Sequence, residues 1–291
     1  MSALDRRMHP KNAVLRHCRR DGNGVARLIV DKTHPFFFDH PLDHVPGLLL
    51  LEGAVQAAQA RVTAPSFVSA ILADFKQYTF IDKDILLHTT VAKDSGSVIC
   101  TTEFEQDSVV RASIRVTLTP TLQEIDQTSS IPLCAMSSLD DMLPCTSRSL
   151  NKQRPENVLI TTPVLTDQRV TAQLLPLSDK CLFSDSAETV HPLYLLEAFM
   201  QVQRFLNAHH DGDKRIRDIL TGVSFDQSAP ITNFDDGVAL DGAREFVGTG
   251  KNRLARSAWL TSGGRRFAKC SIRTAQVATK TKSKTEEPQP V

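Results

Sequence analysis

The chain has 291 residues, of which 41% are apolar, and this length suits one large domain or two of ordinary size. Lys and Arg number 34 against 33 Asp and Glu, so the formal charge of +1 provides no field that would attract nucleic acid or an anionic membrane. The six cysteines show no spacing typical of zinc, and no apolar run approaches the roughly 20 residues of a bilayer span. The N-terminus also lacks an apolar signal segment. We therefore expect a cytoplasmic protein with no metal, no membrane span and no nucleic-acid partner.

The first half of the chain opens with a short predicted strand at residues 25–30, followed by a loop rich in His, Asp and Phe. Pro46-Gly47 favours a helix start there, because the missing N–H of a proline is not needed in the first turn. The segment from Leu48 to Thr63 is apolar nearly all round, which predicts a buried helix. Residues 97–118 alternate between apolar and polar side chains around a turn near 106–108, which predicts a β-hairpin.

A similar order of elements follows in the second half. Residues 121–153 are rich in Ser, Pro and Asp and lack periodicity, so we expect a linker on the surface. A strand at 169–175, a helix after His191-Pro192 and a hairpin turning at 262–264 come next. The last residues, 277–291, have the composition of a disordered tail.

The two halves match at an offset of 145 residues, which indicates an internal duplication. At this offset Glu52 and Gln56 meet Glu197 and Gln201, and other identical pairs occur on both sides of them. These include Pro10 with Pro155, Asn12 with Asn157, Phe38 with Phe183, and Leu50-Leu51 with Leu195-Leu196. We interpret residues 9–120 and 154–276 as two copies of one α+β unit, each with a helix followed by an antiparallel meander.

Each predicted helix carries a carboxylate in apolar surroundings. The first helix has one polar stripe, formed by Glu52, Gln56 and Gln59. The second helix has an equivalent stripe, formed by Glu197, Gln201 and Arg204. A buried carboxylate must find a partner or keep its proton with a raised pKa. The stripe is therefore either a structural polar seam or a chemical site, and its repetition beside a His/Asp loop favours the site.

The segment HPFFFDHPLDHVPGLLLLEGAVQAA, residues 34–58, resembles the signature of the A-factor biosynthesis hotdog family, which makes the γ-butyrolactone skeleton of bacterial signalling molecules. The second copy, CLFSDSAETVHPLYLLEAFMQVQ, keeps the Phe and the E-x-x-x-Q but replaces the His/Asp cluster. The resemblance implies a tandem double hotdog, in which each copy is an antiparallel sheet wrapped around one long central helix.

The resemblance also implies an acyltransferase. Members of the family are held to transfer a β-ketoacyl group from an acyl carrier protein thioester to the hydroxyl of dihydroxyacetone phosphate. The phosphopantetheine arm carries the acyl group, so no separate cofactor is expected, and a coenzyme A thioester is the other possible donor. A monomer or a homodimer is expected.

Hotdog dehydratases supply the template for the site. There a loop histidine and a helix-start N–H of one hotdog face a helix carboxylate of the other. Carried onto this chain, the template pairs His40 and Gly47 with Glu197. The reciprocal site would combine Asp185 and Pro192 with Glu52, but proline has no N–H to donate, so we expect one competent site per chain.

Roles follow from the chemistry of transfer to an alcohol. His40 is the candidate base, the Gly47 N–H the oxyanion donor, and Glu197 the residue that orients the histidine or the acceptor. Three aromatic side chains line an acyl channel or simply fill the core: Phe36, Phe37 and Phe38. Four polar side chains are candidates for substrate binding, with a local structural role as the alternative: Asp43, His44, Gln56 and Gln201. His34 and Asp39 are expected to bond the turn.

Four strand arginines are either phosphate ligands or solvated side chains: Arg111, Arg115, Arg265 and Arg266. Two rival functions stay open at this point. One is a hotdog dehydratase or thioesterase acting on acyl thioesters, for which His40 and Glu197 would serve equally well. The other is a non-catalytic acyl-ligand-binding protein, because an eroded second copy can lose chemistry and retain a pocket.

Overall fold

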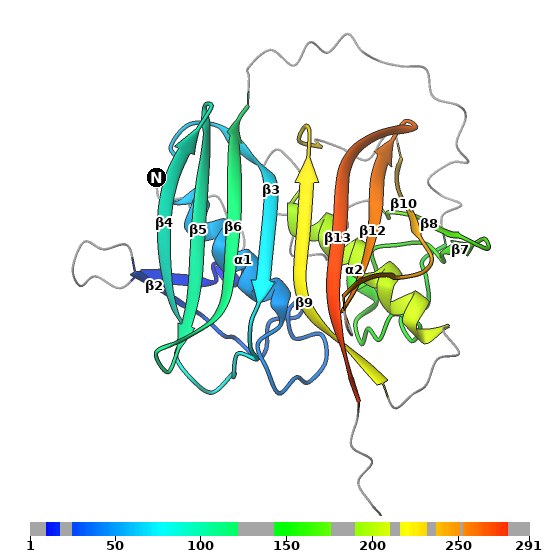
Figure 1. Ribbon diagram of the computed structural model, residues 1–291, viewed down its shortest axis with the longest axis horizontal. Coiled ribbons are helices and arrows are strands. Elements are labelled where there is room, and N and C mark those ends of the chain that lie inside the picture. Colours follow the sequence, from blue (N-terminus) through cyan, green and yellow to red (C-terminus); the bar gives the residue numbers. More distant parts are fainter. Residues whose placement is uncertain are drawn as a thin grey trace, which may run out of the picture.

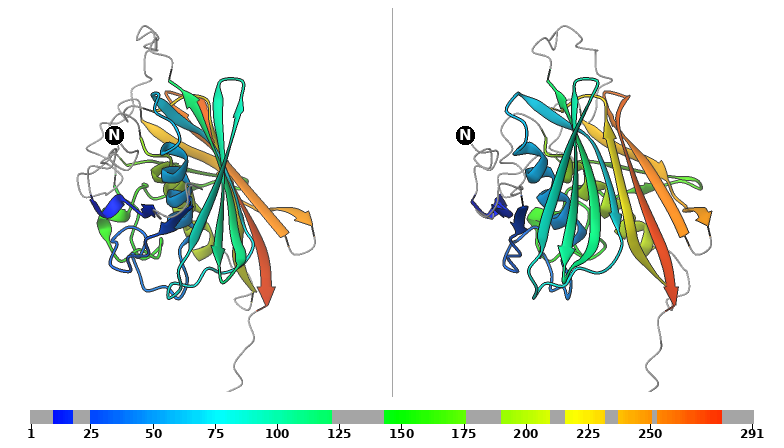
Figure 2. Two further views of the ribbon diagram at one scale, coloured as in Figure 1. Left: turned by 90° about the vertical axis from the view of Figure 1, so that its left-hand side faces the viewer. Right: turned by 60° about the vertical axis from the view of Figure 1, so that its left-hand side comes forward.

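The structure is a computed structural model that describes residues 10–17, 25–121, 143–175, 190–209, 216–231, 237–250 and 253–278. Within these residues, α1 (Gly47–Gln59) and α2 (Pro192–Ala208) lie side by side on one face of a large antiparallel sheet (Figures 1 and 2). The two helices begin 145 residues apart, which is the offset of the sequence match. No helix among the described residues is long and apolar enough to cross a bilayer.

The first half of the chain forms one half of the sheet, in the order β1-β2-β4-β5-β6-β3. The strands are β1 (Leu15–His17), β2 (Val25–Leu28), β3 (Ser66–Phe75), β4 (Leu86–Asp94), β5 (Ser97–Gln106) and β6 (Val109–Pro120). Asp107 and Ser108 form the turn of the β5–β6 hairpin with φ of 54° and 60°. The hairpin predicted for residues 97–118 is therefore confirmed.

The second half continues the sheet in the mirrored order β9-β13-β12-β10-β8-β7, with β11 paired to β12. The strands are β7 (Val164–Leu165), β8 (Arg169–Gln173), β9 (Ile216–Gln227), β10 (Val238–Ala243), β11 (Val247–Gly250), β12 (Arg253–Ser262) and β13 (Arg265–Ala278). Gly263 and Gly264 turn the β12–β13 hairpin with φ of 52° and 77°, a conformation that glycine adopts without strain.

Strands β3 and β9 join the halves into one sheet (Figure 1). Their pairing runs from Ala70 opposite Asp226 to Asp74 opposite Gly222. Arg273 donates across this seam to Asp74, and a Cβ at Gly222 would collide with its guanidinium group. The missing side chain at Gly222 thus gives the arginine room to bridge the two halves.

Equivalent polar clamps hold each helix to the segment before the first strand of its half. Gln56 donates to the Asn12 carbonyl and accepts from the Val14 N–H at 3.1 Å. Gln201 donates to the Asn157 carbonyl at 2.7 Å and accepts from the Leu159 N–H at 2.9 Å. Each asparagine ends a short 3₁₀ helix, at Pro10–Asn12 and Pro155–Asn157. This contact gives a physical reason for the matching Pro and Asn positions in the two halves.

Part of the expected linker belongs to the packed structure. Cys145 and Leu150 are buried and Lys152 is only 9% exposed, so residues 143–153 are anchored in the core at these three positions, while other residues of the segment lie on the surface as expected. Residues 122–142 of that range lie outside the described residues. At the C-terminus β13 continues to Ala278, past the predicted end of the second copy, and residues 279–291 of the predicted tail are not described.

Candidate active site

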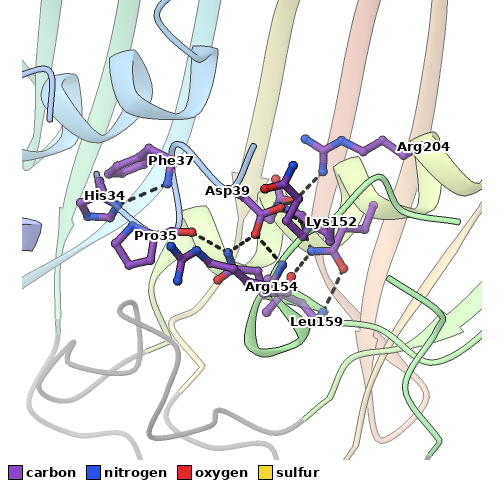
Figure 3. A network of polar contacts seen from close by, with 12 residues as sticks. His34, Pro35, Phe37, Asp39, Lys152, Arg154, Leu159 and Arg204 are labelled. Atoms are coloured by element: carbon purple, nitrogen blue, oxygen red, sulfur yellow. Dashed lines mark hydrogen bonds and ion pairs between the residues drawn. The ribbon is translucent and has the colours of Figure 1, made fainter. Parts of the chain in front are cut away.

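The loop before α1 is shaped by its own polar side chains. His34 is buried, and its Nδ1 accepts hydrogen bonds from the N–H groups of Phe36 and Phe37 at 3.3 Å each. Figure 3 shows the bond from Phe37. This geometry supports the turn-bonding role expected for His34. Phe36 and Phe37 are buried, whereas Phe38 is partly buried against the core.

Asp39 ties this loop to the second half of the chain. Its carboxylate is buried and accepts from the N–H groups of Gln153 and Arg154 at 2.7 and 3.1 Å, and from Asn157 Nδ2 at 2.7 Å (Figure 3). The sequence had led us to expect partners within the turn, but the partners of Asp39 are distant in sequence. Asp39 thereby fixes the position of the next residue, His40, against the second half.

A cavity of about 420 Å³ lies between the two halves, and its walls include His40, Gly47 and Glu197. These are the residues that the hotdog template brings together from the two copies. His40 is half-buried, and among the described residues its Nδ1 has no hydrogen-bond partner. Burial, helped by the positive charge of Arg204, lowers the pKa of His40 from 6.5. The imidazole is therefore neutral at pH 7 and able to accept a proton.

Glu197 is fully buried and held by cations. Its Oε1 lies 2.8 Å from Lys152 Nζ and 2.6 Å from Arg204 Nη1, and it also accepts from Gln201 at 3.1 Å. Figure 3 shows Lys152 and Arg204 in this polar network. Burial by itself would raise the pKa of Glu197, but the charges of Arg204 and Lys152 and their hydrogen bonds lower it to about 2. Glu197 is thus a permanent carboxylate at neutral pH.

The sequence had suggested only part of this arrangement. Arg204 could be found from its place in the polar stripe of α2, seven residues after Glu197. Lys152 was missed because it lies in a stretch that resembled a surface linker. Its Nζ also lies 5.7 Å from the ring centre of Phe36, so it packs between the two halves.

The start of α1 separates this cavity from a second one of about 480 Å³. His44, Gly47 and Leu220 border both cavities. Gly47 is the first residue of the helix, where a backbone N–H has no carbonyl partner within the helix. A Cβ on Gly47 would lie 3.2 Å from Phe75 Cζ, so a side chain here would crowd the wall.

Asp43 and His44 form a pair at the rim. His44 Nδ1 lies 2.7 Å from Asp43 Oδ1, and this hydrogen bond lowers the pKa of Asp43. The Asp43 side chain is 96% exposed and borders neither cavity. Asp43 is therefore placed to orient His44, and the substrate contact expected for it is not supported by its position.

In the reciprocal site, the side chain of His191 lies against Glu52. Glu52 is fully buried, accepts from Gln56 at 2.6 Å and lies 3.2 Å from His191 Nε2. His191 caps α2 by accepting from the Leu193 N–H through Nδ1, so in the neutral ring Nε2 carries the proton toward Glu52. Glu52 borders neither described cavity, and Asp185 lies outside the described residues. The catalytic role expected for Glu52 thus has no support in this geometry.

Other expected site residues have structural contacts. Gln56 and Gln201 use their side-chain amides in the clamps described above and border neither cavity, so their expected role in substrate binding stays a prediction. Phe36 and Phe37 border the first cavity, whereas Phe38 borders neither. Four arginines considered as phosphate ligands also border neither cavity: Arg111, Arg115, Arg265 and Arg266. In the described ranges no cluster of three or more His, Cys, Asp or Glu is placed to hold a metal ion.

Similarity to solved structures shows the fold. An acyl-CoA thioesterase II from Mycobacterium marinum superposes with a TM-score of 0.56 at 14% identity, covering 92% of this chain and 97% of that one. A hot dog fold protein of unknown function from Alicyclobacillus acidocaldarius gives 0.59 at 11% identity, covering 96% and 99%. A monomeric dehydratase domain of a trans AT polyketide synthase gives 0.55 at 14% identity, covering 87% and 98%. The chain therefore has the hotdog fold.

Similarity in sequence to curated relatives covers short stretches of the chain. A synthase from Streptomyces virginiae, named 2-oxo-3-(phosphooxy)propyl 3-oxoalkanoate synthase, is 45% identical over 58 residues, which are 20% of each chain. A protein of the same name from Streptomyces griseus is 63% identical over 35 residues, which are 12% of each chain. These matches span about a fifth or less of the curated relatives. The model of the A-factor biosynthesis hotdog domain matches residues 6–122, so this part of the chain is similar to that family.

Proposed function

We propose that the protein transfers a 3-oxoacyl group from a thioester of acyl carrier protein or coenzyme A to the hydroxyl of a small phosphorylated alcohol such as dihydroxyacetone phosphate. The observation that carries the proposal is the single cavity bordered by His40, Gly47 and Glu197, to which both halves contribute. The names of the Streptomyces relatives, which describe a phosphorylated ester of a 3-oxo acid, indicate the substrate class.

The reaction requires one proton to move twice. In the proposed scheme neutral His40 takes the proton of the acceptor hydroxyl as its oxygen attacks the thioester carbonyl carbon. The oxyanion that forms accepts from the Gly47 N–H, which lies at the positive end of α1. The tetrahedral intermediate then expels the thiolate, which receives the proton from His40. The products are an ester and a free thiol, and the histidine returns to its neutral state.

The state of Glu197 favours this scheme over dehydration. Loss of a hydroxyl as water needs a proton donor, and a carboxyl with a pKa of about 2 between two cations holds no proton at neutral pH. In the proposed scheme Glu197 is a fixed anion that positions Lys152 and Arg204. It does not exchange protons with the substrate.

The two adjoining cavities favour a two-substrate transferase over a thioesterase. They share the wall formed by His44, Gly47 and Leu220, and their volumes are about 420 and 480 Å³. A hydrolase needs space for one organic substrate and water, whereas a transferase needs space for a donor and an acceptor on either side of the reacting carbonyl. The position of Gly47 between the cavities suits such a reacting centre.

The test is incubation with a 3-oxoacyl thioester and dihydroxyacetone phosphate, with products identified by mass spectrometry. We expect a phosphorylated ester, and a loss of rate of about 10²- to 10⁴-fold in His40→Ala. His88→Ala is the matched control, because His88 lies on β4 and borders neither cavity.

Three other outcomes would contradict the proposal. Free 3-oxo acid as the main product would indicate a thioesterase. An enoyl product from a 3-hydroxyacyl thioester would indicate a dehydratase. Binding of acyl thioesters with no turnover would indicate a ligand-binding protein.

A further inference from the structure

A compact turn, residues 146–152, forms one wall of the first cavity. The N–H groups of residues 149–152 donate to the carbonyls of residues 146–148, and Asn151 completes the turn with φ of 52°, which asparagine tolerates better than most residues. Leu150 is fully buried and anchors the turn in the core. The cavity wall therefore has a fixed backbone at this point.

This turn directs polar side chains at the cavity. Arg148, Ser149, Asn151 and Lys152 all border it, and Arg204 approaches from α2. Hydroxyl, amide, ammonium and guanidinium groups are hydrogen-bond donors, and together they match the acceptor oxygens of a phosphate. An apolar acyl chain would offer no acceptor to these groups.

The charges on the wall are not balanced. Three cationic side chains, Arg148, Lys152 and Arg204, face two carboxylates, Asp39 and Glu197, which leaves one net positive charge. Both carboxylates already accept hydrogen bonds, although those to Glu197 all reach Oε1 and its Oε2 has no partner among the described residues. Asp39 accepts from backbone N–H groups and Asn157, and Glu197 accepts from Lys152, Arg204 and Gln201.

Arg148 is the cation that is most available to a ligand. Its side chain is exposed at the cavity, and Arg148 makes no ion pair with a carboxylate among the described residues. Arg204 makes its contact with Glu197 through Nη1 alone, so the remaining donors of its guanidinium fork are directed elsewhere.

We propose that the turn 146–152 and Arg204 form the binding site for the phosphomonoester group of the acceptor, with Arg148 as the residue that selects phosphorylated over unphosphorylated alcohols. This inference rests on the proposed function, because it assigns one of its two substrates to one cavity. The first cavity then holds the acceptor, and the adjoining cavity holds the thioester arm. The Glu197 carboxylate keeps Lys152 and Arg204 in place before the ligand arrives.

The test measures binding of dihydroxyacetone phosphate by calorimetry, without an acyl donor. Wild-type protein is expected to bind this probe and to bind dihydroxyacetone at least tenfold more weakly. Arg148→Gln is expected to weaken binding of the phosphorylated probe about tenfold, as for loss of one charge-assisted contact. Arg148→Lys, which keeps the charge but loses the fork, is expected to fall between the two.

Arg265→Gln is the matched control, because Arg265 is exposed at the start of β13 and borders neither cavity. Coenzyme A serves as a second probe, since its phosphates belong to the donor. The proposal is overturned if Arg148→Gln leaves the affinity for dihydroxyacetone phosphate unchanged, if Arg265→Gln weakens it equally, or if only coenzyme A binding is lost.

The experiments distinguish failure of the proposed phosphate site from failure of the proposed acyl transfer. Charge-dependent binding of dihydroxyacetone phosphate without ester formation would support the site and reject the acyl transfer. Ester formation with equal preference for dihydroxyacetone would support the acyl transfer and reject the site.

Discussion

Replacing Glu197 by Gln should destabilise the protein because it leaves a buried cation without its counter-charge. The Lys152 side chain is 5% exposed, and its Nζ lies 2.8 Å from the Glu197 carboxylate. The Arg204 side chain is 31% exposed, so it can turn toward solvent when the carboxylate is lost. The destabilisation should therefore come mainly from Lys152.

Two routes give the size of the effect. Removing one partner of a buried ion pair typically costs about 3–5 kcal/mol. Independently, a pKa lowered from 4.5 to about 2 corresponds to roughly 3 kcal/mol of favourable interaction with the ionised form. We expect Glu197→Gln to lower the free energy of unfolding by about 3–4 kcal/mol at pH 7.

Lys152→Met provides the decisive comparison, because it removes the buried charge while keeping an unbranched side chain. Alone it should cost about 1–2 kcal/mol, since Arg204 still neutralises Glu197. Added to Glu197→Gln, it should restore about 2 kcal/mol, a coupling expected for residues in direct contact. Urea unfolding of the four proteins at pH 7, with the midpoint and slope of each transition, measures this cycle.

Glu197 does not neutralise a buried charge on Lys152 if Glu197→Gln costs less than about 1 kcal/mol, or if Lys152→Met restores no stability to the Glu197→Gln protein. The pH dependence provides a further check. Because the pKa of Glu197 is lower in the folded than in the unfolded state, its contribution is complete above pH 4.5 and is lost as pH falls toward 2. The wild type should lose more stability than Glu197→Gln over this interval.

Three further predictions concern the site and its support. Because the pKa of His40 is lowered from 6.5, the acidic limb of the pH profile of kcat/KM for ester formation should lie below pH 6.5. This limb should be absent from the residual activity of His40→Ala. An unchanged limb in that variant would mean that another residue is the base. Gly47→Pro removes the N–H that the proposed oxyanion contact needs and should reduce kcat about 10²-fold. Gly47→Ala keeps the N–H and only crowds Phe75, so it should reduce kcat far less. Equal losses of kcat in the two variants would indicate a steric cause. Gln56→Leu and Gln201→Leu should each lower the free energy of unfolding by about 2–4 kcal/mol, because each leaves a buried backbone N–H and a buried carbonyl unpaired. Thermal unfolding of the two variants measures this loss. A loss near zero in either variant would show that the two clamps are not equivalent.

The fold could be predicted from the sequence where local patterns decide it. The helix beginning at Pro46-Gly47 and the turn at Gly263-Gly264 follow from the backbone preferences of proline and glycine. The match between Glu52 and Glu197 at one fixed offset placed both helices in equivalent positions. The predicted first helix nevertheless extended to Thr63, past its observed end at Gln59, where Arg61 and Val62 donate to carbonyls three residues back and the last turn tightens.

The partners of buried charges could not be predicted in this way. Asp39 was expected to bond its own turn, but its partners lie 114 to 118 residues further along the chain. The burial of Lys152 depends equally on tertiary packing, since nothing in a Ser- and Pro-rich stretch distinguishes a buried lysine from a solvated one. The contact between His191 and Glu52 also depends on how the two helices pack, and the sequence alone directed attention to Pro192 instead.

The β3–β9 seam makes assembly of the cavity independent of protein concentration. When two separate chains form such a sheet, dilution dissociates the pair and dismantles any pocket between them. Here both partners of the seam belong to one polypeptide, so their encounter is intramolecular and has an effective concentration set by the chain itself. A cell that contains only a few copies of this protein therefore has the same fraction of complete cavities as one that contains many.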